Sequence, residues 1–557
     1  MIEGNADFER IARFKADIVV VGAGPVGIIT ALALAGKGLA VILLESGGQR
    51  PDAAAQGLSG AINLRPDNHH APEITVSRQL GGTSNLWGGR CLPYDPIDYA
   101  PRPWLGLPGW AIGAHDLDPY MDAACSMLGA GSRAQYRDAL TEVSADGDFS
   151  FDSLERWSNV PRAHVLHGRA LEETENLLVV LGATAIGFLY DAAGRIEAVD
   201  THIEGKGRGL IDAPEVVLAA GGNESTRLLL AEQRRVPGLF GDKLGRNYMG
   251  HLAGTLADVE IHNQALHDGL DFHVDRHGSY VRRRIVPCTR LQADERLANI
   301  AFWPVVPEIF DPRHRSGPLS AVFLALSIAP LGRRLVAEAI RLRHVGEAPH
   351  RRLAHIVNML RDPIATMGFA PWFLWKSKFS TPRLPGLFIQ NPARRYGLEY
   401  HSEHLPSPES RLTLSGECDR LGQPRLAIDL RFSGQDANSI VRAHGALDEW
   451  LTRNQLARLI YRYPAEERSA RILAEAKHGN HQIGTIPMGN TRCEGIVDRD
   501  CRTFDVPNLS VVSTAVLPTS GHGNPTMAAV QLGLRLADRV ANERRRPAVR
   551  TAGTAAA

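Results

Sequence analysis

The pattern of hydrophobic residues near the N-terminus predicts a strand, a turn, a helix and a second strand in succession. An apolar run over 17–22 leads into a glycine-rich turn, a helical pattern follows to about Lys37, and a second apolar run ends in Glu45. Short continuous apolar runs bounded by glycine are typical of buried parallel strands. The pattern therefore predicts a βαβ unit at the start of an α/β domain.

The turn of this unit carries the glycine spacing of a dinucleotide site, GxGxxG, at Gly22, Gly24 and Gly27. Gly22 permits the tight turn, Gly24 lets a pyrophosphate approach the backbone at the helix N-terminus, and Gly27 lets the helix pack closely on the strand. Glu45 ends the second strand, where an acid accepts hydrogen bonds from ribose hydroxyls. The motif alone fits either NAD or FAD.

Two further segments favour FAD. Residues 213–232 form an apolar strand that runs into Ala220, Gly221 and a helix, as expected of a flavoprotein chain that returns to its dinucleotide domain. The loop "QLGGTSNLWGGR" over 79–90 is glycine-rich and aromatic, which suits backbone lying against a flat ring. The residues of this loop predicted to contact FAD are Gly82, Thr83, Asn85, Trp87, Gly88 and Gly89.

Near the C-terminus, "TSGHGNPTMAAVQLG" over 519–533 predicts a helix that begins at Pro525. Proline is favoured in the first turn of a helix, and Asn524 before it is a good N-cap residue. His522 and two glycines occupy the same helix start. We therefore expect a ligand to approach this helix N-terminus closely.

Several ordered motifs together resemble the glucose–methanol–choline (GMC) flavoprotein oxidoreductases over nearly the whole chain. They are "LGRNYMGH" at 244–251, "HLPSPESRLTLS" at 404–415 and the block from "HQIGTIPMGN" to "TSGHGNPTMAAV" at 481–530. Within that family the chain is most similar to bacterial members near pyranose oxidase and the C-glycoside oxidases. The resemblance implies an α/β fold with a discontinuous Rossmann-like FAD-binding domain and an α+β substrate domain that contains a mostly antiparallel sheet.

The resemblance also implies how the chain divides. The FAD-binding domain is expected from 1–100, 166–255 and 471–545, with a connecting cap over 101–165 and a substrate-binding domain over 256–470. The tail over 546–557 is expected to be disordered.

For the chemistry, the resemblance implies that His481 is the base that accepts the hydroxyl proton and that Asn524 orients the alcohol beside flavin N5. A neutral imidazole is suited to take up a proton near pH 7. His522 is a further possible substrate contact, and Ala515, Pro525 and Thr526 are predicted to contact the flavin. The implied function is oxidation of an alcohol to a carbonyl, on a secondary hydroxyl of a sugar, glycoside or related polyol.

Two positions depart from the family. Pyranose oxidase bonds FAD covalently through a histidine of its glycine-rich loop, whereas Leu86 stands at the matching position here, so noncovalent FAD is expected. His69 and His70 lie nearby in the sequence, but nothing places them on the flavin. Ser513-Thr514-Ala515 stands where many members have Asp-Ala-Ser.

Other functions remain open at the level of sequence. The same scaffold serves hydroxynitrile lyases, which leave the flavin oxidised, and the alcohol oxidised need not be a sugar. A flavin-containing electron carrier would leave His481 and Asn524 without a role. Whether oxygen or another molecule accepts the electrons is not determined by the sequence.

Composition narrows the partners. A net charge of +1 gives no reason to expect nucleic acid. The six cysteines are scattered without zinc spacing, so neither a metal site nor disulfides are expected, and an acidic N-terminus unlike a secretory signal favours the cytoplasm.

One segment has no role in this scheme. Residues 331–362 form a basic helical pattern, and an aromatic, basic stretch follows at 370–379. A helical insert packed on the substrate domain is the simpler interpretation, and contact with a membrane surface or a second copy through 331–379 is the alternative.

Overall fold

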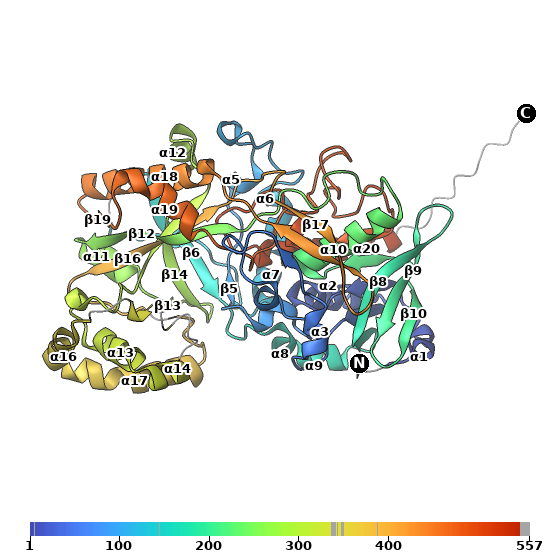
Figure 1. Ribbon diagram of the computed structural model, residues 1–557, viewed down its shortest axis with the longest axis horizontal. Coiled ribbons are helices and arrows are strands. Elements are labelled where there is room, and N and C mark those ends of the chain that lie inside the picture. Colours follow the sequence, from blue (N-terminus) through green and yellow to red (C-terminus); the bar gives the residue numbers. More distant parts are fainter. Residues whose placement is uncertain are drawn as a thin grey trace, which may run out of the picture.

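The computed structural model describes residues 1–545 except 5, 144, 336–340, 342–343, 347–349 and 387. The tail over 546–557 and part of the 331–362 insert therefore lie outside the described residues. The described residues form a parallel sheet, a large antiparallel sheet and two smaller sheets, and Figure 1 shows the large antiparallel sheet toward the left of the molecule. No helix among the described residues is long and apolar enough to cross a bilayer.

The first sheet is parallel throughout and is built from segments far apart in the chain. Its strands pair in the order β1 (Ile2–Gly4), β7 (Leu177–Leu181), β3 (Val41–Glu45), β2 (Ile18–Val21), β11 (Val216–Leu218) and β20 (Leu509–Val511). The buried strand residues are almost all Val, Ile and Leu, because helices and a further sheet cover both faces. This is the discontinuous Rossmann-like arrangement that the resemblance implies.

The elements predicted near the N-terminus form as expected. β2 and β3 are the two apolar runs, and α2 (Pro25–Ala35) is the helix between them. The returning segment supplies β11 and α10 (Gly221–Arg235), and β11 pairs with β2. α20 (Thr526–Arg545) packs on α2 and completes the layer.

The second sheet is antiparallel, as expected of the substrate domain. Its order is β19 (Ala457–Tyr461), β12 (His251–Ile261), β16 (Arg395–Glu403), β15 (Ile300–Val305), β14 (Tyr280–Pro287), β6 (Phe149–Trp157) and β5 (Arg90–Cys91), and β13 (His273–Val274) pairs with β14. β5 and β6 come from chain segments outside the predicted 256–470 domain. Helix α18 (Gly434–Arg453) packs on this sheet and buries Trp450.

Two smaller sheets and a helical group complete the fold. They are β10–β9–β8 (Gly207–Asp212, Ile196–Ile203, Ala183–Tyr190) and β17–β18–β4 (Arg411–Cys418, Pro424–Asp429, Ile62–Asn63). Helices α13 (Gly317–Ser327), α14 (Ala329–Leu335), α16 (Arg352–Arg361) and α17 (Pro363–Lys378) gather at the lower left of Figure 1, beyond the antiparallel sheet.

Candidate active site

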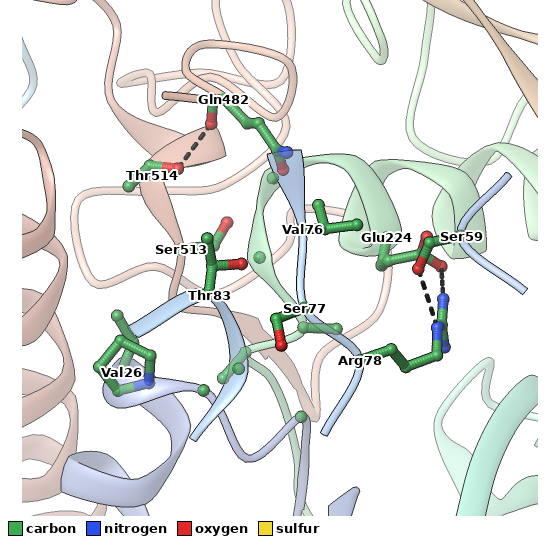
Figure 2. Close-up of a pocket in the computed structure, with 18 of the residues that line it drawn as sticks. Val26, Ser59, Val76, Ser77, Arg78, Thr83, Glu224, Gln482, Ser513 and Thr514 are labelled. Carbon is green, nitrogen blue, oxygen red and sulfur yellow. Dashed lines mark hydrogen bonds and ion pairs between the residues drawn. The ribbon is translucent and has the colours of Figure 1, made fainter. Parts of the chain in front are cut away.

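A cavity of about 520 Å³ lies at the carboxyl ends of the parallel strands β2, β3, β11 and β20. The glycine-rich turn before α2, the loop over 82–90, the start of α10 and the start of α20 all line it. Figure 2 shows Thr83, Ser513 and Thr514 on one side of this space and Arg78 and Glu224 on another. Ligands of open parallel sheets bind at this edge of the strands.

The three glycines of the N-terminal motif have different surroundings. Gly22 has φ +103° and approaches Ala220, so a side chain there would collide with backbone. A Cβ on Gly27 would lie 1.8 Å from Gly22 O, which shows how closely α2 packs on the turn. A Cβ on Gly24 would meet no protein atom, because that position faces the cavity.

The N-terminus of α2 is open toward the same space. Its N-cap is Gly24, and no side chain accepts hydrogen bonds from its first N–H groups. Uncapped N–H groups at a helix start are an anion-binding arrangement. The turn therefore has the geometry of an anion-binding site.

Glu45 lines the cavity and is anchored by the backbone. Its Oε2 accepts from Ala23 N at 3.0 Å and its Oε1 accepts from Gly47 N at 2.9 Å. Burial raises the pKa of the Glu45 carboxyl, and the two N–H groups oppose that shift. The side chain is held at the place where the sequence predicts a ribose contact.

Most of the residues predicted to contact the cofactor line this cavity. They are Gly22, Gly24, Glu45, Gly82, Thr83, Trp87, Gly88, Ala220, Gly221, His481, Asn524, Pro525 and Thr526. Gly27, Asn85, Gly89 and Ala515 do not line it. Asn85 instead donates to Leu80 O and Gly82 O and so fixes the loop, and Ala515 is fully buried behind the cavity wall.

His481 and Asn524 meet at one end of the cavity. Asn524 Nδ2 lies 3.2 Å from His481 Nε2, and Asn524 Oδ1 accepts from Arg90 Nε at 2.7 Å. Because a guanidinium only donates, the amide oxygen of Asn524 must face Arg90 and its NH₂ must face His481. His481 Nε2 is therefore an acceptor and carries no proton.

The other nitrogen of His481 leads to the same conclusion. His481 Nδ1 lies 2.7 Å from His251 Nδ1, and His251 Nε2 lies 3.2 Å from the carbonyl oxygen of Ser520. That carbonyl only accepts, so His251 carries its proton on Nε2 and accepts at Nδ1 from the Nδ1–H of His481. Hydrogen bonds at both ring nitrogens thus place the proton of His481 on Nδ1 and leave Nε2 unprotonated at the cavity, where it accepts from Asn524.

The surroundings keep these imidazoles neutral. Burial, together with the cation of Arg90, lowers the pKa of His481 to about 3. Burial also places the pKa of His251 and of His401 well below the ordinary value. The sequence predicts a base that titrates near pH 7, and the structure instead gives one that stays unprotonated at much lower pH. Negative charge developing in the cavity would offset Arg90 and raise the proton affinity of His481.

His522 does not reach the cavity. Its Nε2 donates to Asp95 Oδ2 at 2.6 Å, and its Nδ1 accepts from Arg284 at 2.8 Å. The ring is buried, and its carbonyl accepts from Nδ1 of His401 at 2.6 Å. Both ring nitrogens are thus engaged, so the structure places His522 as a support behind the site and not as the substrate contact that the sequence left open.

Asn524 is not the helix cap that the sequence predicts. Ala529 N donates to Pro525 O at 3.1 Å, which puts Pro525 at the N-cap position of α20. The Asn524 amide is bonded to Arg90 and His481 instead. The correction arises because tertiary hydrogen bonds outcompete a local cap for one short side chain.

A second cavity of about 220 Å³ opens beside the first, and Arg90 lines both. Its walls include Trp157, Phe272, Trp303, Phe388, Arg282 and Glu399. The guanidinium of Arg282 lies over three of these aromatic rings, at 4.9 to 5.5 Å from their centres. Glu155, buried between strands, bonds Arg282 and lies 3.3 Å from Arg90. Aromatic walls with a few charged groups are typical of small-molecule sites.

Sequence reasoning missed Arg90 and His251, although both end motifs that drew attention. Arg90 ends the glycine-rich loop and His251 ends "LGRNYMGH". Neither position has a local pattern that reveals its partner, because those partners are hundreds of residues away in the chain.

Comparison with known proteins identifies the family. A model described as GMC oxidoreductase matches residues 406–533, which include His481 and Asn524. The fructose dehydrogenase large subunit of Gluconobacter japonicus is 23% identical and aligns with 95% of this chain and 98% of that protein. Paromamine 6'-oxidase of Streptomyces fradiae is 24% identical over 95% of this chain and 91% of that protein. Residues 406–533 are thus a GMC oxidoreductase C-terminal domain, and the relatives resemble the chain over nearly its whole length.

Solved structures show the same fold. Pyridoxine 4-oxidase from Mesorbium loti superposes with a TM-score of 0.56 at 17% identity, covering 94% of this chain and 99% of that one. Formate oxidase superposes with a TM-score of 0.51 at 16% identity, covering 95% and 98%.

The relatives also establish the class of reaction. The protein is an oxidoreductase that acts on CH–OH groups, and GMC oxidoreductases bind FAD. The residues present fit that cofactor: Gly24 offers bare backbone, α2 offers uncapped N–H groups, and Glu45 lies at the end of β3. All six cysteines are free.

Proposed function

We propose that the protein oxidises a secondary hydroxyl of a sugar, glycoside or related polyol to a carbonyl, with His481 as the base. The observation that carries the proposal is the unprotonated Nε2 of His481, which lies at the cavity beside the NH₂ group of Asn524. An unprotonated imidazole that cannot rotate away is ready to take the hydroxyl proton.

FAD, when bound, supplies the acceptor for the hydride that leaves the alcohol carbon. The chain would hold its phosphates at Gly24 and the N-terminus of α2, and its ribose at Glu45. Leu86 lines the cavity where pyranose oxidase has its attaching histidine, so the cofactor is proposed to be noncovalent. Pro525 and Thr526 bring the positive end of the α20 dipole to the same cavity.

Asn524 orients the alcohol in this proposal. Its NH₂ group points to His481 Nε2, so an alcohol oxygen between the two would accept from the amide while donating its proton to the imidazole. Arg90 holds the amide in that orientation. The pair thus selects the position of the hydroxyl before any proton moves.

The aromatic cavity supports a sugar or glycoside as substrate. Trp157, Phe272, Trp303 and Phe388 offer flat apolar walls, on which the C–H face of a pyranose ring or an aromatic aglycone can pack. Glu399 and Arg282 offer an acceptor and a donor for hydroxyls. The related fructose dehydrogenase and paromamine oxidase are named for sugar-like substrates, which agrees with this choice.

The experiment is an anaerobic screen of sugars, aryl glycosides and simple alcohols, followed by flavin absorbance. A substrate should bleach the flavin without oxygen, and later addition of oxygen or an artificial acceptor identifies the electron acceptor. Turnover without bleaching would instead support a lyase. If only non-sugar alcohols bleach the flavin, the sugar proposal is wrong and the substrate is another natural-product alcohol. Flavin that stays on the polypeptide after acid precipitation would refute noncovalent FAD.

The free cysteines support a cytoplasmic location as part of the same proposal.

A further inference from the structure

The helical group beyond the antiparallel sheet exposes an unusual amount of apolar surface. More than half of the large apolar side chains that are exposed in the described chain lie between residues 328 and 379. Soluble proteins rarely gather such side chains on one patch without a binding partner. Most of them lie on α16 and α17, which Figure 1 places at an outer edge of the molecule.

α16 has the burial pattern of a soluble helix reversed. Leu353, Ile356, Val357 and Leu360 recur at helical spacing and all are exposed, with Leu353 at 79% and Leu360 at 74%. Such a stripe normally faces the core.

The opposite face of α16 buries polar side chains. His355 bonds Ser320 Oγ and Phe310 O, both at 3.1 Å, and Asn358 donates to Pro312 O at 2.9 Å. These bonds fix the orientation of α16, because turning the apolar stripe inward would break them and leave Ser320 Oγ, Phe310 O and Pro312 O without these partners.

α17 continues the same surface. Thr366, Phe369 and Phe373 form its more buried stripe, and the opposite stripe is apolar too. Ile364, 86% exposed, Met367 and Trp375 lie on that outer stripe. A helix that is apolar on both faces is normally surrounded by apolar material. The outer stripe therefore needs a cover that this chain does not supply among its described residues.

The positive charge beside the exposed apolar stripes of α16 and α17 indicates which kind of partner covers them. Arg351, Arg352 and Arg361 are exposed beside the apolar stripes, Lys376 lies on α17, and Asp362 is the single acid in residues 350–380. A second copy docking through a twofold axis would bring these cations together, which is unfavourable. An anionic lipid surface instead complements them.

We infer that the exposed faces of α16 and α17 dock on an anionic membrane surface. Leu353, Leu360 and Ile364 enter the headgroup–acyl boundary, the tryptophans lie at that level, and the arginines contact lipid phosphates. The helices lie in the interface and do not cross it, which agrees with their length. This inference does not depend on the substrate or on the base.

Sedimentation with vesicles tests it on the full-length flavoprotein. The wild type should pellet with vesicles of equal parts phosphatidylcholine and phosphatidylglycerol, and far less with phosphatidylcholine alone. High salt should weaken the binding. The double variant Leu353→Glu/Ile364→Glu should bind the anionic vesicles at least about tenfold more weakly, since both apolar area and charge complementarity are lost.

The matched control is Val165→Glu/Leu210→Glu, which changes two other exposed apolar residues, on α8 (Ala163–Leu166) and β10 in the other half of the molecule (Figure 1), and it should bind like the wild type. Retained flavin and an unchanged melting temperature show that each variant is folded. Failure of the wild type to bind, or equal binding by both double variants, overturns the inference. A wild-type dimer that Leu353→Glu/Ile364→Glu dissociates, without vesicle binding, assigns the patch to a second copy instead.

Discussion

The glycine-rich turn over 22–27 with the flanking β2 and α2, called here the cradle, and the series of hydrogen bonds around His481 lie at the same cavity but are built in different ways. The cradle is a strand, a turn and a helix contiguous in sequence, and it offers backbone N–H groups. The series of hydrogen bonds from Arg90 through Asn524 and His481 to His251 joins side chains from four separate segments.

The two regions therefore differ in the substitutions that they tolerate. In the cradle, what matters is the absence of a side chain, so a single methyl group is enough to change it. In the hydrogen-bond series, the position of the ring proton decides whether Nε2 of His481 can accept a proton. A residue that never touches substrate can therefore still control the reaction. Variants that change FAD binding without changing the rate of flavin reduction, or the reverse, therefore test this difference between the two regions.

The largest effect is expected for His481→Ala. Anaerobic flavin reduction by a competent substrate should slow by about 10²–10⁴-fold, with FAD still bound, because the base is lost and the cradle is intact. Rapid mixing measures the rate. His444→Phe is the control, since it removes another buried imidazole, in α18, away from both cavities. Equal rates in the two variants would show that His481 is structural.

The cradle is tested by two glycine variants of opposite kind. Gly24→Ala places a methyl group in the open cavity, so the purified protein should contain less FAD while the apoprotein melts like the wild type. Gly27→Ala forces a methyl group onto Gly22 O and should destabilise the fold by about 1–3 kcal/mol. FAD content by absorbance and thermal unfolding of the apoproteins separate the two. Identical behaviour would mean that Gly24 does not face the cofactor.

His251→Leu tests control by a residue outside the cavity. It removes the acceptor of the His481 Nδ1 proton, so that proton can move to Nε2, and reduction should slow by at least about tenfold, or ~1.4 kcal/mol. His251→Asn keeps an acceptor oxygen and should recover part of the rate. The wild-type rate should not fall between about pH 8 and pH 5 through protonation of His481, because its pKa lies at about 3. A shifted pH profile in His251→Leu, with FAD retained, distinguishes positioning from mere packing.

The smallest effect concerns stability and pH. Burial lowers the pKa of His444 to about 4, whereas an unfolded histidine titrates near 6.5. As pH falls below about 6.5 the unfolded state takes up the proton first, so stability is lost progressively down to about pH 4. His444→Phe should reduce the loss of unfolding free energy over this window by up to about 1.4 kcal/mol per pH unit, measured as a smaller fall in melting temperature. A steeper fall in the variant would contradict the neutral buried imidazole.

Much of the fold and half of the site were predictable from sequence. The apolar runs, the spacing of Gly22, Gly24 and Gly27, and the acid at Glu45 are local patterns that determine a local unit, and that unit forms as predicted. The motifs at 481 and 524 were enough to predict that His481 and Asn524 meet.

Tertiary structure alone determined the rest. It moved the Asn524 amide from a helix cap to Arg90, removed His522 from the cavity by pairing it with Asp95, and placed the proton of His481 through His251. It also turned the apolar stripe of α16 outward, against its pattern. The physical reason is that a polar side chain bonds the partner that folding brings near, and sequence spacing does not encode that partner. In α16 the same reason applies through His355 and Asn358, whose bonds to neighbouring segments leave the apolar stripe outside.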